Sequence, residues 1–420
     1  MKNRFIPGMM AAVMCISLAG CSKNDSEVAE TTAAMLSEQV SDSAETAPEE
    51  PFVLENGITD AMYKRALISE GNRSRLVKAM QNAQNSGKIT VGVIGGSITQ
   101  GSLASNQANC YAELFHSWWT EKFPDCEVDF VNAGIGGTNS YLGVHRVDEQ
   151  LLSAEPDVVI VEFSVNDTDK VMNKYSYDSL VRKILNSEGA PAVMLLFTAS
   201  TDGNNLQEVH KEIGSFYNLP MISYREAFYP EIEAGNIESK DISPDGLHPN
   251  DDGHRLIGQL LTRYLDSVYD DIANIDTNDI SVPDKPYTAD YYAEAVMLGA
   301  SEVSPIEISG FELGSNSVYP QLFPDNFVTA GEGYLKFESE CKCLGFFYLK
   351  QTNGKGGKYD VYVDGERKGT LEADFSGGWG NYGDTKQIII SKEKEKHTVE
   401  IKLAEGSANT ELTILGIMQS

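Results

Sequence analysis

Between about residues 57 and 270, five short apolar runs alternate with amphipathic segments, and this alternation constrains the fold more than any other feature. Each run is nearly continuously apolar and rich in Val, Ile and Leu, as in parallel strands covered by helices on both faces. The segments between the runs carry apolar residues at helical spacing. The pattern predicts a three-layer α/β/α domain with five parallel strands, at 89–94, 128–132, 158–163, 192–197 and 219–222. Helices are expected at 74–86, 109–122, 141–152, 177–186 and 206–217, with a last one after Pro249.

From about residue 285 onward the sequence changes to alternating apolar and polar positions, Gly-rich turns and no long helical pattern. Tyr359–Val363 followed by Asp364-Gly365 is typical of a β-hairpin, and 397–403 alternates as a half-buried strand does. These features predict a smaller β-sandwich domain over residues 285–420. An Asp-, Asn- and Pro-rich stretch around 271–286 is the expected junction with the first domain.

The N-terminus has the pattern of a signal peptide. Lys2 and Arg4 precede an apolar stretch, 5–18, that is too short to span a bilayer as a helix. Its end, Leu18-Ala19-Gly20-Cys21, resembles the lipobox of bacterial lipoproteins, in which the cysteine is lipidated after cleavage. We therefore expect residues 1–20 to be removed and Cys21 to anchor the chain, outside the cytoplasm, to the bacterial cell membrane. An ordinary secretory signal with a chance cysteine is the alternative.

The charge of the chain limits its partners. Residues 21–56 are mainly Ser, Thr, Ala, Glu and Asp, and this composition predicts a disordered acidic tether. The whole chain carries 62 acidic and 33 basic residues, a formal net charge of -29. Such a chain is not expected to bind nucleic acid. Membrane attachment would have to come from the lipid at Cys21 rather than from a basic patch.

The remaining cysteines, Cys110, Cys126, Cys341 and Cys343, predict no metal site. They lack paired C-x-x-C spacing, and the histidines lack the spacing of metal ligands. A predicted helix would hold Cys110 and Cys126 roughly 20 Å apart, beyond disulfide reach. No organic cofactor is expected either, because the Gly-rich stretch after the first strand has neither a P-loop lysine nor a dinucleotide-binding pattern.

A serine and a histidine carry the pattern of nucleophilic catalysis. The first predicted strand ends in Gly95-Gly96-Ser97-Ile98-Thr99, which places Ser97 at the carboxyl edge of the sheet, where open α/β folds bind ligands. The candidate base lies in Asp245-Gly246-Leu247-His248-Pro249. A carboxylate three residues before the histidine can reach Nδ1 and leave Nε2 free to accept the serine proton.

Two further motifs follow predicted strands at the same edge: Asn132-Ala133-Gly134-Ile135-Gly136-Gly137 and Ser164-Val165-Asn166-Asp167. In this order the four motifs resemble those of the SGNH/GDSL hydrolases, over about residues 85–268. The resemblance implies a flavodoxin-like catalytic domain at 57–270. The chain departs from the family pattern in having Gly96 before the serine, where Asp is usual, and Ile98 after it, where Leu is usual.

The resemblance also implies the roles of these residues. Ser97 would be the nucleophile, with Asp245 and His248 completing the triad. The oxyanion hole would comprise the N–H groups of Ser97 and Gly137 and the side-chain amide of Asn166. The spacing alone leaves open which of the glycines in the second motif faces the oxyanion. The neighbouring Thr99, Asn132, Thr138 and Asp167 are expected to support these loops.

The expected activity is that of a serine esterase that hydrolyses short acyl esters, above all acetyl esters on a polysaccharide or glycan, through an acyl-serine intermediate. A lipase or lysophospholipase, a thioesterase and a non-catalytic glycan-binding surface module are the alternatives. In the β domain, Trp379 and Tyr382 lie in a Gly-rich segment. They favour either stacking on a sugar or, equally, a role of Trp379 in plugging the sandwich or its interface with the catalytic domain.

Overall fold

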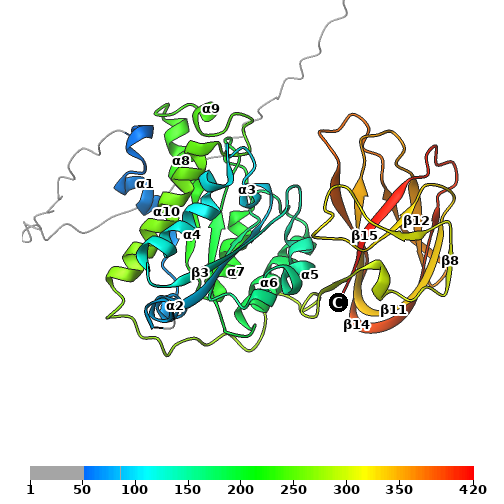
Figure 1. Ribbon diagram of the computed structural model, residues 1–420, viewed down its shortest axis with the longest axis horizontal. Helices are drawn as coiled ribbons and strands as arrows, with labels where there is room; N and C mark the ends of the chain where they lie inside the picture. The colour runs from blue at the N-terminus through cyan, green and yellow to red at the C-terminus, as the bar shows by residue number, and fades with distance from the viewer. Residues whose placement is uncertain (1–51, 86) are drawn as a thin grey trace, which may run out of the picture. The chain divides into compact units, whose positions relative to one another are not determined.

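A computed structural model of the chain describes residues 52–85 and 87–420 (Figure 1). The predicted signal peptide, Cys21 and nearly all of the predicted tether lie outside the described residues. No helix in the described part of the chain is long and apolar enough to cross a membrane. The described residues form one compact unit that contains two β-sheets. The domain boundaries predicted at residues 270 and 285 stay predictions.

The first sheet confirms the five predicted parallel strands and adds a sixth. The strand order is β1-β6-β5-β4-β2-β3. The additional strand, β1, pairs antiparallel with β6 at the edge of the sheet. Its three residues are too few to show an alternating or continuous apolar pattern, so this strand could not be predicted from the sequence. The strands are β1 (Leu67–Ser69), β2 (Lys88–Gly95), β3 (Glu127–Gly134), β4 (Val158–Glu162), β5 (Ala192–Phe197) and β6 (Met221–Ser223).

The predicted helices are present, with shifted ends. One begins at Val171 rather than at Tyr177, and α1 and α8 were not predicted. Five shorter helical segments, three of them 3-10 helices, also lie in the described part of this domain. The longer helices are α1 (Asp60–Ala66), α2 (Ser74–Asn85), α4 (Tyr111–Lys122), α5 (Ser140–Gln150), α6 (Val171–Leu185), α7 (Gln207–Phe216), α8 (Tyr224–Glu233) and α10 (Asp251–Asp270).

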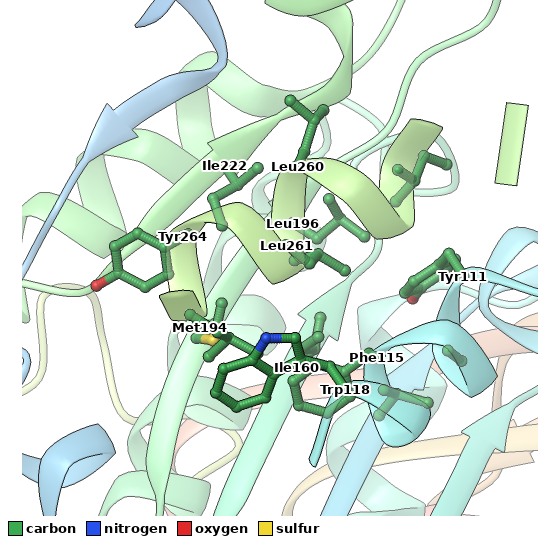
Figure 2. Close-up of a cluster of buried hydrophobic side chains, with 14 of the residues drawn as sticks. Tyr111, Phe115, Trp118, Ile160, Met194, Leu196, Ile222, Leu260, Leu261 and Tyr264 are labelled. Carbon is green, nitrogen blue, oxygen red and sulfur yellow. The ribbon is translucent and has the colours of Figure 1, made fainter. Parts of the chain in front are cut away.

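Helices cover both faces of this sheet, because successive residues of the central strands point into two different cores. In β4, Ile160 belongs to the core formed with α2, α4, α8 and α10, whereas Val161 belongs to the core formed with α5, α6 and α7. Figure 2 shows the first core, where Leu260 and Leu261 of α10 face the strand residues. The continuous apolar runs in the sequence follow from this double coverage.

The second sheet forms the predicted all-β domain. It contains nine antiparallel strands in one hydrogen-bonded network. The long strands β11 and β14 have register shifts, and β11 pairs with β8 near Tyr334 but with β15 near Phe346. Register shifts bend a strand, and the nine strands form one continuous antiparallel sheet, a half-barrel, rather than the two separate sheets of the predicted β-sandwich. The strands are β7 (Val296–Leu298), β8 (Glu307–Ser309), β9 (Glu312–Gly314), β10 (Asn326–Thr329), β11 (Tyr334–Lys350), β12 (Lys358–Val363), β13 (Glu366–Glu372), β14 (Tyr382–Leu403) and β15 (Leu412–Gln419).

The predicted hairpin is the β12–β13 connection. Its turn residues Asp364 and Gly365 have φ values of 51° and 82°. These left-handed conformations are those of a two-residue turn that matches the twist of the strands. The strand predicted over 397–403 is the last part of β14.

Buried residues connect the two sheets. Tyr141 of α5 packs edge-on against Tyr292, with ring centroids 5.4 Å apart. Phe347 of β11 belongs to the same buried cluster as the residues of α5 and α6. The β domain therefore packs directly on the helices that follow the second and third motifs.

Candidate active site

Ser97, His248 and Asp245 form a continuous hydrogen-bonded chain. Ser97 is the first residue of a short helix, α3 (Ser97–Gln100), that begins directly after β2 and Gly96. Its Oγ lies 2.9 Å from His248 Nε2, and His248 Nδ1 lies 2.7 Å from Asp245 Oδ2. These distances permit proton transfer from the hydroxyl to the imidazole and orientation of the imidazole by the carboxylate.

The loop that carries Asp245 and His248 is fixed at both ends. Asn250 caps α10 by accepting the N–H of Gly253 at 3.0 Å, and its own N–H donates to Ile242 O at 3.0 Å. Gly246 has φ +80° and accepts the N–H of Thr201 at 2.9 Å. His248 is thus held just before the start of α10, a helix that packs in the first of the two cores.

Asp245 is ionised at neutral pH. Its burial acts to raise the pKa of the carboxyl group, but hydrogen bonds from the His248 ring and from the backbone N–H groups of His248 and Leu247 outweigh this effect and lower the pKa to about 2. Oδ1 accepts both N–H groups, at 2.8 and 2.9 Å. The other oxygen therefore stays available to His248 Nδ1.

The glycine before Ser97, where the family usually has Asp, makes room for Asn166. A Cβ at Gly96 would lie 2.1 Å from Asn166 Oδ1. Asn166 follows β4, and Gly96 follows β2, the neighbouring strand in the sheet. Gly96, which differs from the Asp that is usual in the family, thus allows the first and third motifs to pack closely.

The hydrogen bonds of the second motif distinguish its glycines. Gly134 donates its N–H to Asn132 Oδ1 at 2.9 Å, and Gly136 donates to Gln100 Oε1 at 2.7 Å. Gly137 has φ +73°, and its N–H has no acceptor among the described residues. Of these three amides, only that of Gly137 remains free to bind an oxyanion.

Ser97 N–H and the Asn166 side-chain amide likewise have no acceptor in the described part of the chain. Both residues line the same cleft as Gly137. The structure thus brings all five residues expected from the sequence to one place. Preorganised donors of this kind can stabilise negative charge that develops on a carbonyl oxygen.

Buried polar groups support these loops, as expected. Thr99 Oγ1 donates to Glu162 at 2.9 Å, and Asn132 Nδ2 donates to Thr99 O at 2.9 Å. Asp167 accepts the N–H of Ser140 at 2.8 Å and pairs with the buried His210 at 3.0 Å. Thr138 Oγ1 donates to Ile135 O at 2.7 Å.

Glu162 is a support that the sequence analysis missed, because it is the last residue of a strand that is otherwise apolar. It also accepts the hydroxyl of Thr198 at 2.6 Å. Burial raises the pKa of its carboxyl group, against the opposing effect of its hydrogen bonds from Thr198, Thr99 and the Gly96 backbone. Glu162 thus connects β5 to the turn that carries Ser97.

The cleft around Ser97 is bounded by both domains and has a volume of about 980 Å³. From the β domain it is lined by the segment 318–322 and by Trp379, Asn381 and Tyr382. No motif marks the segment 318–322, and its place in the cleft depends on how the domains pack.

Trp379 is 73% exposed. Its ring stacks on Tyr382 with centroids 5.0 Å apart, and Phe375 packs edge-on against both rings. The exposure contradicts the alternative in which Trp379 plugs the sandwich, but the ring does border the catalytic domain, since a Cβ at Gly137 would lie 3.7 Å from it. The indole lines the cleft that contains Ser97.

Within residues 52–85 and 87–420, no group of three or more His, Cys, Asp or Glu side chains is arranged to hold a metal ion. The cysteines Cys110, Cys126, Cys341 and Cys343 are free thiols. The chemistry that the described site can perform with its own residues is nucleophilic attack by a serine hydroxyl.

The GDSL-like Lipase/Acylhydrolase family model matches residues 93–256, a range that spans all four motifs. Thioesterase 1/protease 1/lysophospholipase L1 of Escherichia coli (strain K12) is 23% identical over 184 residues, which are 42% of this chain and 83% of that protein.

Similarity to solved structures extends over both domains. A two-domain esterase (CEX) active on acetylated mannans, co-crystallised with mannopentaose, is 32% identical, and the match covers 85% of this chain and 97% of that chain with a TM-score of 0.78. A second crystal structure of a two-domain esterase (CEX) active on acetylated mannans is 33% identical, with coverage of 85% and 98% and a TM-score of 0.78.

Proposed function

Since the chain belongs to the GDSL-like lipase/acylhydrolase family and is an esterase, we propose that it removes acetyl groups from a mannan-type polysaccharide by a Ser-His-Asp mechanism. The observation that carries the proposal is the exposed ring of Trp379, which stacks on Tyr382 in the same cleft as Ser97. A substrate that combines a small ester with a sugar face can use both features at once.

In the first half of the reaction, Ser97 Oγ attacks the acetyl carbonyl carbon while His248 Nε2 takes the hydroxyl proton. The carbonyl oxygen becomes negatively charged and accepts hydrogen bonds from the N–H groups of Ser97 and Gly137 and from the Asn166 amide. The tetrahedral intermediate then collapses. The bond to the sugar oxygen breaks, this oxygen takes the proton from His248, and acetyl-Ser97 remains.

Water completes the cycle. His248 removes a proton from the water molecule, and the resulting hydroxide attacks the acetyl-serine carbonyl carbon. The same three donors bind the second oxyanion. When the bond to Ser97 breaks, Oγ recovers a proton from His248, and acetic acid leaves and ionises to acetate in solution.

Two observations support a glycan as the leaving group. Trp379 offers an exposed ring beside the triad, and aromatic faces pack well on the apolar faces of sugars. The two-domain esterase that is similar over both domains acts on acetylated mannans. This similarity includes the β domain, whereas the Escherichia coli relative matches only 42% of the chain.

A non-catalytic glycan-binding module is set aside because the chain is an esterase. Lysophospholipase or thioesterase activity has support from the Escherichia coli relative, at lower identity and without the β domain. We also propose that Cys21 is lipidated and anchors the enzyme outside the cytoplasm, on the basis of Leu18-Ala19-Gly20-Cys21.

The substrate proposal is tested by product release from a panel of esters. The full chain is incubated with acetylated mannan oligosaccharides, acetylated xylan oligosaccharides, lysophosphatidylcholine and palmitoyl-coenzyme A, and initial rates are measured at several concentrations. We expect the highest kcat/KM with the acetylated mannan oligosaccharides. A higher kcat/KM with a long-chain lipid or thioester would overturn the proposal.

A further inference from the structure

Arg146 on α5 is a buried cation without a carboxylate partner. Its side chain is only 1% exposed. Nη1 donates to Gln150 Oε1 at 2.9 Å and Nη2 donates to Gly95 O at 3.2 Å, and both acceptors are neutral. Nε is buried without a hydrogen-bond partner, and no Asp or Glu among the described residues pairs with the guanidinium.

Burial of this charge without a charged partner lowers the free energy of unfolding. Transfer of a charged group into a protein interior is unfavourable unless a counter-charge compensates it, and buried arginines are therefore usually paired. Burial lowers the pKa of Arg146 to about 9, so that the side chain is still protonated at neutral pH. The fold thus retains an uncompensated positive charge at this position.

The surroundings of Arg146 connect it to the active site. Gly95, whose carbonyl it binds, ends β2 and precedes the turn that carries Ser97. The same carbonyl accepts the N–H of Ile135 at 3.1 Å, and Ile135 begins the 135–137 loop that ends with the free amide of Gly137.

The other hydrogen-bond acceptor of Arg146, Gln150, connects it to the wall of the cleft. Gln150 donates its side-chain amide to Leu322 O at 3.4 Å, and Leu322 lines the cleft. Arg146 therefore lies where the end of β2, the 135–137 loop and the β-domain segment 318–322 meet.

We propose that Arg146 is a positioning residue that holds the Gly95 carbonyl and the 135–137 loop and supplies positive charge behind the oxyanion hole. The inference rests on the proposed Ser97 mechanism. A fixed charge in a low-dielectric interior acts more strongly than in water. It stabilises the negatively charged tetrahedral intermediate but hardly affects the neutral ester, so it should raise kcat and leave KM unchanged.

The test separates the charge of Arg146 from its hydrogen bonds. Arg146→Gln keeps a donor and removes the charge, and Arg146→Lys keeps the charge. Arg75→Gln is a matched control, because Arg75 on α2 is partly buried, donates to the carbonyl oxygens of Leu185, Pro191 and Ile280 with no carboxylate partner among the described residues, and does not line the cleft. All variants are made in the full chain, and their folding is checked by thermal unfolding.

Two readouts are compared: kcat and KM with 4-nitrophenyl acetate, and inhibition by a small alkylboronic acid, whose adduct with a serine is tetrahedral and negatively charged. For Arg146→Gln we expect kcat to fall about 10-fold or more, with KM nearly unchanged and boronic acid binding weakened by a similar factor. Arg146→Lys should keep most of the wild-type kcat and most of the boronic acid affinity. Arg75→Gln should lower Tm without changing kcat or boronic acid binding.

A loss of Tm in Arg146→Gln with unchanged kcat and boronic acid binding would overturn the inference. If Arg146→Gln does not fold, Arg146→Lys decides, because a folded Lys variant that loses both readouts also contradicts a role for the charge. Failure of the substrate proposal is distinguishable: a wild-type chain that hydrolyses 4-nitrophenyl acetate but not acetylated mannan refutes the substrate and leaves the Arg146 readouts intact.

Discussion

The backbone N–H of Gly136 donates to the side-chain oxygen of Gln100 at 2.7 Å. This bond joins the loop of the second motif to the helix that begins with Ser97. It occupies one of the two adjacent amides and leaves that of Gly137 free, so Gln100 helps to determine which glycine can bind the oxyanion.

Replacement of Gln100 should therefore impair turnover more than substrate binding. We expect Gln100→Ala to lower kcat for an acetyl ester about 10-fold, because the loop loses the bond that orients the Gly137 amide. Gln100→Glu retains an acceptor oxygen and should lose less. Gln107→Ala is the control, since the side-chain amide of Gln107 donates to the backbone carbonyl of Gln100 and not to the loop of the second motif. Equal kcat values for all three variants would contradict this role.

The contact between Asp245 and His248 predicts a larger effect. Asp245→Asn removes the negative charge opposite Nδ1 and allows the wrong histidine tautomer, so kcat should fall by roughly 1,000-fold or more. Asp241→Asn in the preceding short helix, α9 (Ser239–Ile242), is the control and should retain activity. Steady-state kinetics with 4-nitrophenyl acetate measures both. A loss of less than about 10-fold for Asp245→Asn would show that His248 needs no such partner.

Stability should decline in mild acid because of His145. This residue is buried on α5, and burial lowers its pKa from 6.5 to about 4, against the opposing effect of its hydrogen bond with Tyr141 O. Below pH 6.5 the unfolded chain binds a proton that the folded chain excludes. The stabilising contribution is thus complete above pH 6.5 and is lost as the pH falls toward 4, by up to about 1.4 kcal/mol per pH unit.

Urea unfolding at several pH values between 7.5 and 4.5 measures this contribution. The free energy of unfolding should fall less steeply with decreasing pH in His145→Phe than in the wild type. Some dependence should remain, because burial also lowers the pKa of His254. An identical slope for the variant and the wild type would show that His145 is protonated equally in both states.

Trp379 should affect binding of the sugar rather than the chemical step. We expect Trp379→Ala to raise KM for acetylated mannan oligosaccharides about 10-fold and to leave kcat/KM for 4-nitrophenyl acetate within about 2-fold, since stacking on an aromatic ring contributes on the order of 1 kcal/mol. Ile390→Ala is the control, because Ile390 is 47% exposed on the same domain but does not line the cleft. Equal losses on both substrates would indicate a structural role.

The sequence predicted the first sheet and the triad for the same reason: both depend on short-range patterns. Val158–Glu162 is buried on both faces and is apolar up to Glu162, and Asp245 and His248 belong to one loop. The order of the motifs then brought Ser97 to this loop, because parallel strands place their carboxyl ends at one edge.

Features that depend on packing between distant segments could not be predicted. The sequence around Arg146 predicts a helix. It does not indicate that, in the described part of the folded chain, no carboxylate pairs with the Arg146 guanidinium. The register shifts of β11 against β14 lie at Cys341/Cys343 and at Leu344/Gly345, and of these positions only Gly345 is of a residue type that indicates an irregularity within a strand. The segment 318–322 reaches the cleft only because the β domain packs on α5 and α6.

The most direct test of the proposed mechanism is the rate of acetate release from acetylated mannan oligosaccharides by the wild-type chain and by Ser97→Ala, with folding of both confirmed by thermal unfolding. The mechanism predicts that the wild type releases acetate and that Ser97→Ala is slower by roughly 1,000-fold or more, because no acetyl-serine can form. Acetate release by Ser97→Ala at a rate near that of the wild type would contradict the mechanism.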